Sequence, residues 1–500
     1  AYELKQNLIG IGLLYKYGYY DQERNGDRTM VPRYIEKHYH FLTDTGIVFK
    51  IPIHAAQVHV KAYLLKPEVF GTAPVFLLST DIPENDAISR TITERLYDPN
   101  EATRVAQSMV LGIGGAKLID ELGLNIDIYH MNEGHGLPLC FYLYDKYKSK
   151  EEVKKRVVFT THTPEKAGNE ERSVSLLDDM NFFYTENKEP LLKELNIWGD
   201  KLDYTLAAMK FSKIANGVSQ LHGEVAREMW ADKEGVPNII AITNAQNKKY
   251  WKDDVLEDAL AKDDNALLVK RKKELKKQLF NLVAAQCGRI FDENVLTIVW
   301  ARRFAGYKRA NLLMRDFDKF KELVDNAKYP VQIIWAGKPY PEDHDAIGMF
   351  NDLIRKSALF KNTAVLTGYE LFLSALLKKG SDVWLNNPRM YREASGTSGM
   401  TAAMNASINL SIPDGWVPEF AKDGENSFII PVAPKGASIE EQDKTEYENL
   451  YNVLHEKVIP LYYEDQDKWL KITKQAMKEV VPFFDSDRMA DEYYKRMYNS

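Results

Sequence analysis

The sequence contains little cysteine and no long hydrophobic run. Only Cys140 and Cys287 occur among its 500 residues. Two cysteines without a paired spacing exclude a disulfide scaffold and a zinc site built from cysteine. They are typical of a reducing compartment, so a cytoplasmic location is expected. No apolar stretch approaches the roughly 18 residues that indicate a membrane-spanning helix, so no membrane partner is expected.

The sequence also lacks a long basic run and a recognisable metal or phosphate motif. Its net charge of −6 makes nucleic acid and anionic membrane surfaces poor candidate partners. The lysines between 270 and 277 are interpreted as one solvated helix face. No set of His, Asp and Glu has metal-ligand spacing, and there is no P-loop or nucleophile elbow. No bound metal is expected.

The composition is that of an ordinary globular protein, 45% hydrophobic and 28% charged. A single core rarely grows beyond about 250–300 residues, so two main domains are expected. The predicted division is 1–285 for the first domain, 286–440 for the second, and 441–500 for C-terminal helices that cross back to the first. The chain opens at Ala1 inside a helix-like pattern, so we expect the first domain to lack its upstream start.

Short β-rich runs alternate with helical patterns, which is typical of parallel α/β layers. The strands expected in the first domain are 8–14, 58–65, 75–79 and 156–161, and the helices are 102–122, 201–212 and 263–285. The strands expected in the second domain are 295–300, 331–336, 364–367, 382–385 and 427–431, with helices from 440 onward. Ligands of open α/β sheets bind beyond the carboxyl ends of the strands. We predict two Rossmann-like domains that face each other across a cleft.

A basic segment, 302–309, follows the first strand of the second domain. Arg303 and Lys308 are five residues apart, with Gly306 between them. A turn there can direct both cations at one anion, because Arg binds a phosphate through two bonds and Lys acts as a mobile point charge. A solvated basic turn is the alternative interpretation.

A segment rich in small residues, 393–400, follows the strand expected at 382–385. The pattern predicts a loop that opens a helix, where backbone N–H groups and the helix dipole favour a phosphate. Glu393 can accept hydrogen bonds from sugar hydroxyls. A capped structural helix explains the same pattern equally well.

Two segments in the first domain contain histidine, 132–135 and 161–164. His162 lies at the carboxyl end of an expected strand, just before Pro164, which stops strand pairing. Its ring can contact a ligand there. A lone histidine is more often structural, and that alternative stays open on these residues alone.

Six segments in this order and context resemble the α-glucan phosphorylase family, whose members have the two-domain glycosyltransferase-B fold. The similarity covers most of the chain. The segments are 10–19, 132–135, 161–164, 302–309, 382–386, and 393–400 together with Asn405.

The resemblance implies roles for individual residues. It places Arg303, Lys308 and Glu393 at the reaction centre, and it implies that Arg303 and Lys308 bind the substrate phosphate. It also implies that the glucosyl ring is contacted by Glu393 and by four further residues, which are His162, Asn244, Ser395 and Gly396. The residues that it implies lie at the cofactor are Arg302, Thr397, Ser398 and Thr401.

The resemblance also implies a reaction and its partners. In this family, inorganic phosphate attacks the terminal α-1,4 linkage of a glucan or maltodextrin, and glucose 1-phosphate leaves with retained configuration. The phosphate of pyridoxal 5'-phosphate exchanges protons with the substrate phosphate. The expected partners are therefore α-1,4-glucan and inorganic phosphate or glucose 1-phosphate, and a homodimer is the candidate assembly.

Three features depart from the family pattern. Thr401 stands where the family has its imine-forming lysine, and a hydroxyl cannot form an imine, so covalent attachment of pyridoxal phosphate is not expected. Arg302 stands where the best-known members have a lysine. The glycine-rich loop that contacts the cofactor is expected upstream of Ala1.

Two other functions remain open at this point. One is a nucleotide-sugar-dependent glucosyltransferase of the same fold, because 414–420 and 424–428 resemble the segment that holds ribose or sugar hydroxyls in such enzymes. The other is an inactive glucan-binding relative, which the missing lysine at position 401 favours. The presence of Arg303, Lys308 and Glu393 weighs against an inactive relative, since such a protein has no need of a phosphate-binding pair.

Overall fold

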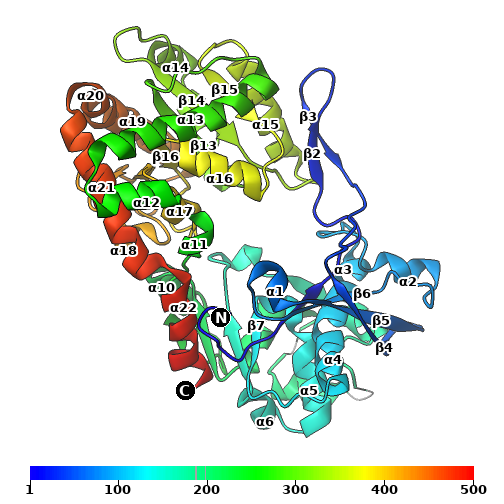
Figure 1. Cartoon of the computed structure of the whole chain (residues 1–500). Helices are drawn as coiled ribbons and strands as arrows, with labels where there is room; N and C mark the ends of the chain where they lie inside the picture. The colour runs from blue at the N-terminus through cyan, green and yellow to red at the C-terminus, as the bar shows by residue number, and fades with distance from the viewer. Residues whose placement is uncertain (186–187, 198, 500) are drawn as a thin grey trace.

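The computed structural model describes residues 1–185, 188–197 and 199–499. It contains two entirely parallel sheets and one mixed sheet, each covered by helices, with two short antiparallel pairs (Figure 1). The α/β class with parallel sheets is therefore confirmed. No helix among the described residues is long and apolar enough to span a membrane.

The largest sheet has six parallel strands in the order β15-β14-β13-β16-β17-β18. Its strands are β13 (Leu296–Ala301), β14 (Val331–Ala336), β15 (Thr363–Leu366), β16 (Val383–Asn386), β17 (Ile408–Ser411) and β18 (Ser427–Ile429). All residues of β13 and β14 are buried, as expected for parallel strands with helices on both faces. These continuous apolar runs explain why all five strands predicted here were found.

The two faces of this sheet support separate cores. Ile298 and Trp300 pack on one face with the helices α14 (Phe317–Val324), α15 (His344–Ser357) and α19 (Ile439–Val453). Val299 and Ala301 pack on the other face with α13 (Asn265–Cys287) and α16 (Leu371–Gly380). Alternate residues of β13 thus pack against helices on opposite faces of the sheet, so the strand is held in place from both sides.

A second parallel sheet has the order β12-β11-β8-β7. Its strands are β7 (Tyr129–Asn132), β8 (Val157–Thr160), β11 (Ile214–Gly217) and β12 (Ile239–Ala241). The helices that accompany it are α5 (Pro138–Tyr147), α6 (Lys150–Lys154), α7 (Val174–Asp179), α8 (Glu189–Glu194), α9 (Tyr204–Lys210) and α10 (Gln220–Met229).

The mixed sheet has the order β1-β6-β5-β4. Its strands are β1 (Gly10–Leu13), β4 (Thr43–Ile53), β5 (Ala56–Leu65) and β6 (Val75–Ser79). Two short helices lie beside it, α1 (Pro67–Phe70) and α2 (Ala87–Thr91). The helix predicted at 102–122 is continuous through α3 (Glu101–Met109), η1 (Val110–Gly114) and α4 (Gly115–Glu121).

A hairpin formed by β2 (Asp21–Arg24) and β3 (Met30–Arg33) extends away from the mixed sheet toward α15 (Figure 1). Tyr20, just before β2, and Met30, next to the hairpin turn, both belong to the core of the six-stranded sheet. The Gln22 amide donates to the carbonyl of Gly337 at 2.9 Å. The hairpin therefore connects the N-terminal part of the chain to the C-terminal sheet.

Two sequence predictions in the helical regions were wrong. The first residues of the helix predicted at 201–212 instead form β10 (Lys201–Asp203), which pairs with β9 (Glu171–Ser173). The helix begins only at Tyr204, because the Asp203 side chain caps it there. The lysines of 270–277 do not form one solvated face. Lys272 and Lys276 are buried, because α13 packs under the sheet and their ammonium groups find carbonyl and carboxylate oxygens there.

The remaining helices run along one side of the molecule. They are α11 (Lys248–Trp251), α12 (Asp254–Ala261), α17 (Ser398–Ala403), α18 (Val417–Phe420), α20 (Ile459–Glu464), α21 (Gln466–Phe484) and α22 (Ser486–Tyr493). Tyr493 at the end of α22 accepts a hydrogen bond from Asn216 of β11 at 3.2 Å. The division at 285 and 440 stays a prediction.

Candidate active site

Two predicted segments meet at the carboxyl edge of the six-stranded sheet. The segment 302–309 follows β13, and the segment 393–400 lies between the end of β16 and the first turn of α17. These two strands are neighbours in the sheet and run parallel. Parallel neighbours end at the same edge, so their following loops lie side by side.

Lys308, Glu393 and Arg302 form a buried ionic cluster at this edge. The Lys308 ammonium donates to the Glu393 carboxylate at 2.7 Å, and the Arg302 guanidinium lies 4.0 Å from the same oxygen. The exposed fraction of each of the three side chains is 11% or less. Arg302 also donates to the side chain of Asn386 and to the carbonyl of Leu385.

Burial and charge act in opposite directions on this cluster. Burial tends to raise the pKa of the Glu393 carboxyl, but the charges of Lys308 and Arg302 hold it below its ordinary value. Burial lowers the pKa of Arg302. The Nε of Arg302 is buried and has no hydrogen-bond partner among the described residues. The cluster thus retains a buried cationic donor that can bind an anion or a hydroxyl.

Arg303 is arranged differently from Arg302. Its side chain is exposed, and its guanidinium has no hydrogen-bond or ion-pair partner within the described part of the chain. Its charge still contributes to lowering the pKa of Glu393, after those of Lys308 and Arg302. Arg303 is therefore a mobile cation close to the buried cluster.

The loop after Glu393 is held tightly against a second turn. Gly415 has a φ of 61°, and a Cβ there would lie 2.1 Å from the carbonyl oxygen of Ser395, so only glycine fits. Gly396 has a φ of 76°, and a Cβ there would lie 3.0 Å from Glu393. The buried hydroxyl of Ser395 has no hydrogen-bond partner among the described residues, so it is available to a ligand.

Asp414 fixes this loop through backbone hydrogen bonds. Its carboxylate accepts the N–H groups of Arg392 at 3.0 Å and Glu393 at 2.9 Å, and its other oxygen accepts the N–H of Gly415. Burial raises the pKa of Asp414 to about 7, although the backbone donors act in the opposite direction. Asp414 therefore positions Glu393 and titrates near neutral pH.

We expect the Asp414 contribution to stability to decrease as the pH rises. The folded state holds the proton up to about pH 7, whereas the unfolded carboxyl loses it near the ordinary aspartate pKa of 3.8. Between these values the folded state binds more protons, so the free energy of unfolding falls with rising pH, by on the order of 4 kcal/mol in total. Urea denaturation of wild type and Asp414→Asn from pH 4 to 8 measures this. The free energy of unfolding of the wild type, relative to that of Asp414→Asn, should fall as the pH rises. A constant or rising difference would contradict the raised pKa of Asp414.

Three of the four residues that the resemblance assigned to the cofactor, Thr397, Ser398 and Thr401, lie in or next to α17, whereas Arg302 belongs to the ionic cluster with Glu393. The Ser398 hydroxyl accepts the indole N–H of Trp384 at 3.2 Å. Thr401 is fully buried, and its hydroxyl donates to the carbonyl of Ser398 at 2.9 Å. Thr397 precedes the helix without a side-chain cap. The Thr401 hydroxyl is thus already engaged inside the helix.

His162 lies just past β8 in the four-stranded parallel sheet. Its backbone N–H and the hydroxyl of Thr163 both donate to the Glu133 carboxylate. Glu133 has a φ of 66°, an uncommon backbone conformation for a residue with a side chain. Burial lowers the pKa of His162, while the Glu133 charge acts in the opposite direction. Glu133 therefore positions the His162 segment, a role that the sequence did not reveal.

Asn244 follows β12 in the same sheet, and its backbone N–H donates to the carbonyl of Val218 at 3.0 Å. The preceding Thr243 donates its hydroxyl to Glu419 at 2.7 Å, and the N–H of Gln220 donates to the other oxygen of that carboxylate at 2.9 Å. Glu419 thus binds the ends of two strand-to-helix connections of the four-stranded sheet.

The edges of the two parallel sheets are in direct contact. The Ser219 hydroxyl, after β11, donates to the carbonyl of Ala394 at 2.7 Å. Arg392 forms an ion pair with Glu165. The structure therefore brings the segment after Glu393 against the edge that carries His162 and Asn244. It joins Arg302, Lys308 and Glu393 directly, whereas His162 and Asn244 lie on the opposing edge without a direct bond to them.

The sequence named most segments of this site but missed several of the residues that position it. Ser219 gave no signal, because it acts through one contact to a segment distant in sequence, and Asn386 was noted only as part of the segment 382–386. Asp414 was noted only as part of another motif. Among the described residues, no group of three or more His, Cys, Asp and Glu side chains could hold a metal ion.

Comparison with known proteins places this geometry in context. The chain is 45% identical to an uncharacterized protein of Methanocaldococcus jannaschii, across 100% of the chain and 93% of that protein. It is 32% identical to the maltodextrin phosphorylase of Thermococcus litoralis, over 100% of the chain and 66% of the relative. It is 30% identical to the glycogen phosphorylase of Mycobacterium tuberculosis, over 100% of the chain and 67% of the relative. The chain thus spans about two thirds of these two phosphorylases, and no family model matches it.

Proposed function

The chain belongs to the glycogen phosphorylase family, and from that premise we propose that it is a retaining glycosyltransferase of the α-glucan phosphorylase type. Its proposed reaction uses inorganic phosphate to release glucose 1-phosphate from the end of an α-1,4-glucan. The observation that carries the proposal is the buried Lys308–Glu393–Arg302 cluster beside the exposed Arg303.

We propose a glycosyltransferase-B arrangement for the two parallel sheets. Their strand ends face one another, with Ser219, Ala394 and Glu419 at the junction. Substrate would occupy the space between the edges, as ligands of open α/β sheets do. In this arrangement His162 and Asn244 approach the sugar from one sheet and Glu393 approaches it from the other.

The proposed chemistry is electrostatic. Breaking a glycosidic bond through an oxocarbenium-like state requires stabilisation of negative charge on oxygen. Lys308 and Arg303 would bind the phosphate, the former from a buried position and the latter from the exposed side. Glu393 would accept hydrogen bonds from sugar hydroxyls while its own charge is balanced by Lys308 and Arg302. Because Lys308, Glu393 and Arg302 are held in place before substrate binds, they need little reorganisation during the reaction, whereas the mobile Arg303 would move onto the phosphate.

The residues at α17 do not fit an imine-bound pyridoxal phosphate. That link needs an amine, whereas α17 (Ser398–Ala403) contains no lysine and the Thr401 hydroxyl is bound to the Ser398 carbonyl. The Ser398 hydroxyl accepts from Trp384 and keeps its own hydrogen to donate, so the misfit rests on the missing amine alone. We therefore derive no step through this cofactor, and we propose that the chain's own cations act on the phosphate.

We expect no covalent pyridoxal adduct at position 401. Incubation with pyridoxal phosphate, reduction with borohydride and mass spectrometry of the digested protein measure this directly. A hydroxyl forms no imine, so the peptide containing Thr401 should keep its unmodified mass. A reduced pyridoxyl group on that peptide would show that the chemistry inferred for this position is wrong.

The decisive experiment compares two glucosyl donors. Purified protein is given maltodextrin with inorganic phosphate and, separately, maltodextrin with nucleotide-glucose donors. The proposal predicts glucose 1-phosphate in the first assay and no transfer in the second. Transfer from a nucleotide-glucose alone would establish the alternative enzyme class, and glucan binding without transfer would establish an inactive relative. Both oxygens of the Glu419 carboxylate already accept hydrogen bonds, from the Thr243 hydroxyl and the Gln220 N–H. This weighs against Glu419 as a ligand of a nucleotide ribose.

Replacing Arg303 with alanine should weaken phosphate binding without destabilising the fold. A charge-assisted hydrogen bond contributes about 1.5–3 kcal/mol, so Kd for inorganic phosphate should rise about tenfold to a hundredfold. Isothermal titration calorimetry measures Kd, and thermal unfolding checks stability. Arg355→Ala, an exposed arginine on α15, is the matched control and should leave Kd unchanged. An unaltered Kd in Arg303→Ala would remove this residue from the site.

A further inference from the structure

The basic segment 302–309 ends in two consecutive cations whose side chains bind different parts of the molecule. The Lys308 ammonium donates to the Glu393 carboxylate at 2.7 Å, whereas the next residue, Arg309, forms an ion pair with helix α19. Arg309 has a φ of 50°, which is uncommon for a residue with a side chain. Such a backbone conformation persists only when the surrounding structure holds it in place. The contacts of Arg309 therefore bear directly on the position of Lys308.

The Arg309 guanidinium is bound by two segments of the chain. It donates to the backbone carbonyls of Asn387 at 2.9 Å and Pro388 at 2.8 Å. It also donates to the Asp443 carboxylate of α19 at 3.1 Å. The Glu446 carboxylate of the same helix lies 2.6 Å from Arg309, as an ion pair without hydrogen-bond geometry. The exposed fractions of the Arg309 and Glu446 side chains are 2% and 1%, and charges buried to this extent require such pairing.

The Asp443 carboxylate binds a second arginine as well. The Arg389 guanidinium donates to its two oxygens at 3.1 and 2.7 Å. The backbone N–H of Arg389 donates to the carbonyl of Tyr307, the residue before Lys308, at 2.8 Å. One carboxylate therefore connects the loop after β13 to the loop after β16, and it does so next to Lys308. We call Arg309, Arg389, Asp443 and Glu446 the α19 network.

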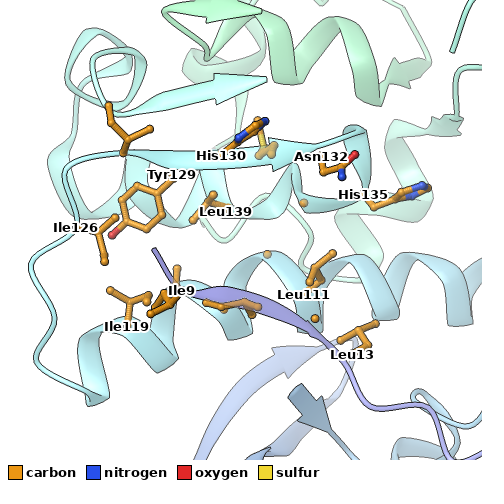
Figure 2. Close-up of a pocket in the computed structure, with 18 of the residues that line it drawn as sticks. Ile9, Leu13, Leu111, Ile119, Ile126, Tyr129, His130, Asn132, His135 and Leu139 are labelled. Atoms are coloured by element: carbon orange, nitrogen blue, oxygen red, sulfur yellow. The ribbon is translucent and has the colours of Figure 1, made fainter. Parts of the chain in front are cut away.

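The α19 network is separate from other features of the molecule. Its two arginines are balanced by its two carboxylates, so it does not depend on the Lys308–Glu393–Arg302 cluster for neutrality. It also lies apart from a cavity of about 760 Å³ between β1 and β7, where Figure 2 shows apolar side chains such as Ile9, Leu111 and Leu139. No residue of the network lines that cavity. Substitutions in the network therefore act on the two loops.

We propose that Asp443 is a positioning residue for the substrate phosphate. Through Arg309 and Arg389 it holds the loop that carries Lys308, and it thereby fixes the Lys308 ammonium where the phosphate binds. The inference rests on the proposed function, in which Lys308 is the buried cation for the phosphate. Within the described part of the chain the Asp443 carboxylate bonds to these two arginines and not to Lys308. Asp443 thus acts through other residues and not on the reacting atoms.

A different carboxylate holds the residue proposed to bind the sugar. Asp414 accepts the backbone N–H groups of Arg392 and Glu393 at 3.0 and 2.9 Å. Asp414 therefore fixes Glu393, whereas Asp443 fixes the loop of Lys308. Loss of the Asp443 charge should disturb the binding of phosphate more than the binding of glucan.

The variant Asp443→Asn tests this through the two KM values of phosphorolysis. It keeps the size of the side chain and removes its charge. We expect KM for inorganic phosphate to rise about tenfold, because even a displacement of one ångström in a reacting group costs no more than roughly 100-fold. KM for maltodextrin should change little. A residue with only a structural role would instead lower the amount of active enzyme, which reduces the apparent kcat and leaves both KM values unaltered. That result would overturn the proposal.

Two further variants serve as controls. Asp443→Glu retains the charge and should recover most of the affinity for phosphate. Glu440 lies on the same helix and pairs with Arg315, but its side chain is 80% exposed. Glu440→Gln should therefore leave both KM values as in the wild type. Equal rises in KM for phosphate in Asp443→Asn and Glu440→Gln would show a general effect of charge on α19 and would also contradict the positioning role.

Hydrogen exchange without substrate separates this inference from the proposed function. The backbone N–H of Lys308 donates to the carbonyl of Ala305 at 2.9 Å, and that of Arg389 donates to Tyr307. Both amides should exchange faster in Asp443→Asn, while the amides of β13 should exchange as in the wild type. Failure of the wild type to release glucose 1-phosphate would refute the proposed function only. Unchanged exchange at Lys308 and Arg389 would refute the positioning by Asp443, whatever reaction the protein performs.

Discussion

Replacing Lys308 with methionine is expected to destabilise the protein by about 3 kcal/mol and to reduce glucosyl transfer by about 100-fold or more. Methionine fills similar space but removes the ammonium that donates to the Glu393 carboxylate at 2.7 Å. The carboxylate would stay buried with only Arg302, at 4.0 Å, as a charged partner. The loss in stability is measured by urea denaturation, and the loss in activity by kcat/KM for phosphorolysis.

The double variant Lys308→Met/Glu393→Gln separates the two effects. Neutralising Glu393 removes the unpaired buried charge, so stability should recover in large part. Activity should not recover, because the phosphate has lost its buried cation. Recovery of both quantities, or of neither, would contradict the roles assigned to this pair.

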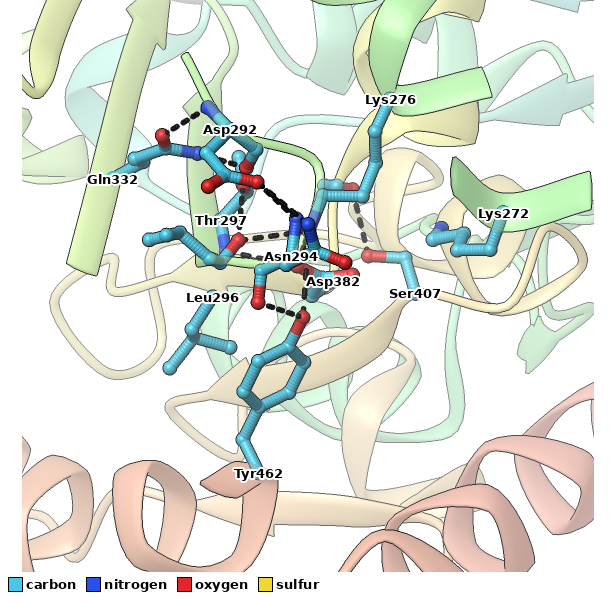
Figure 3. A network of polar contacts seen from close by, with 12 residues as sticks. Lys272, Lys276, Asp292, Asn294, Leu296, Thr297, Gln332, Asp382, Ser407 and Tyr462 are labelled. Carbon is cyan, nitrogen blue, oxygen red and sulfur yellow. Dashed lines mark hydrogen bonds and ion pairs between the residues drawn. The ribbon is translucent and has the colours of Figure 1, made fainter. Parts of the chain in front are cut away.

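Replacing Lys276 with methionine is expected to cost about 3–5 kcal/mol of stability. Lys276 lies on α13 and donates to the Asp382 carboxylate, which also accepts the N–H of Thr297 at 2.9 Å (Figure 3). The exposed fractions of the two charged side chains are 1% and 5%. Without Lys276, the buried Asp382 side chain would lose its ion-pair partner at the entry to β16. Urea denaturation at pH 7 measures the effect.

A neighbouring lysine provides the control for this prediction. Lys277 is 60% exposed and pairs with Glu293 at 3.0 Å, so Lys277→Met should change stability by less than about 1 kcal/mol. The double variant Lys276→Met/Asp382→Asn should regain most of the loss. Similar stability of Lys276→Met and Lys277→Met would show that the buried pair contributes little.

The sequence predicted five of the six strands of the large sheet because most of them are buried on both faces, and it missed β17 (Ile408–Ser411). Strands buried on both faces appear as continuous apolar runs, as at 295–300 and 331–336. β4 (Thr43–Ile53) was missed because it begins with polar residues and is half exposed. The buried lysines of α13 were misread because composition records charge but not the distant oxygens that bind it, such as the Asp382 carboxylate.

The candidate site was predictable in outline and not in detail. The rule that ligands bind beyond strand ends placed 302–309 and 393–400 at one edge, and the structure brings Lys308 and Glu393 into contact there. The strand-end rule did not predict the positioning roles of Glu133 and Ser219, because these roles depend on single contacts between segments that are far apart in sequence. Such contacts become visible only when the fold is known.

The β2–β3 hairpin has a consequence for motion. It anchors the N-terminal part of the chain to the six-stranded sheet through Tyr20 and Gln22. A separate backbone bridge joins Gln246 to Asp485, close to where the chain passes between the two parallel sheets. The hydrogen bond from Ser219 to Ala394 and the ion pair between Arg392 and Glu165 join the same two parts beside Glu393. Widening the space in front of Glu393 would therefore require these contacts to break while the hairpin still holds the two parts together.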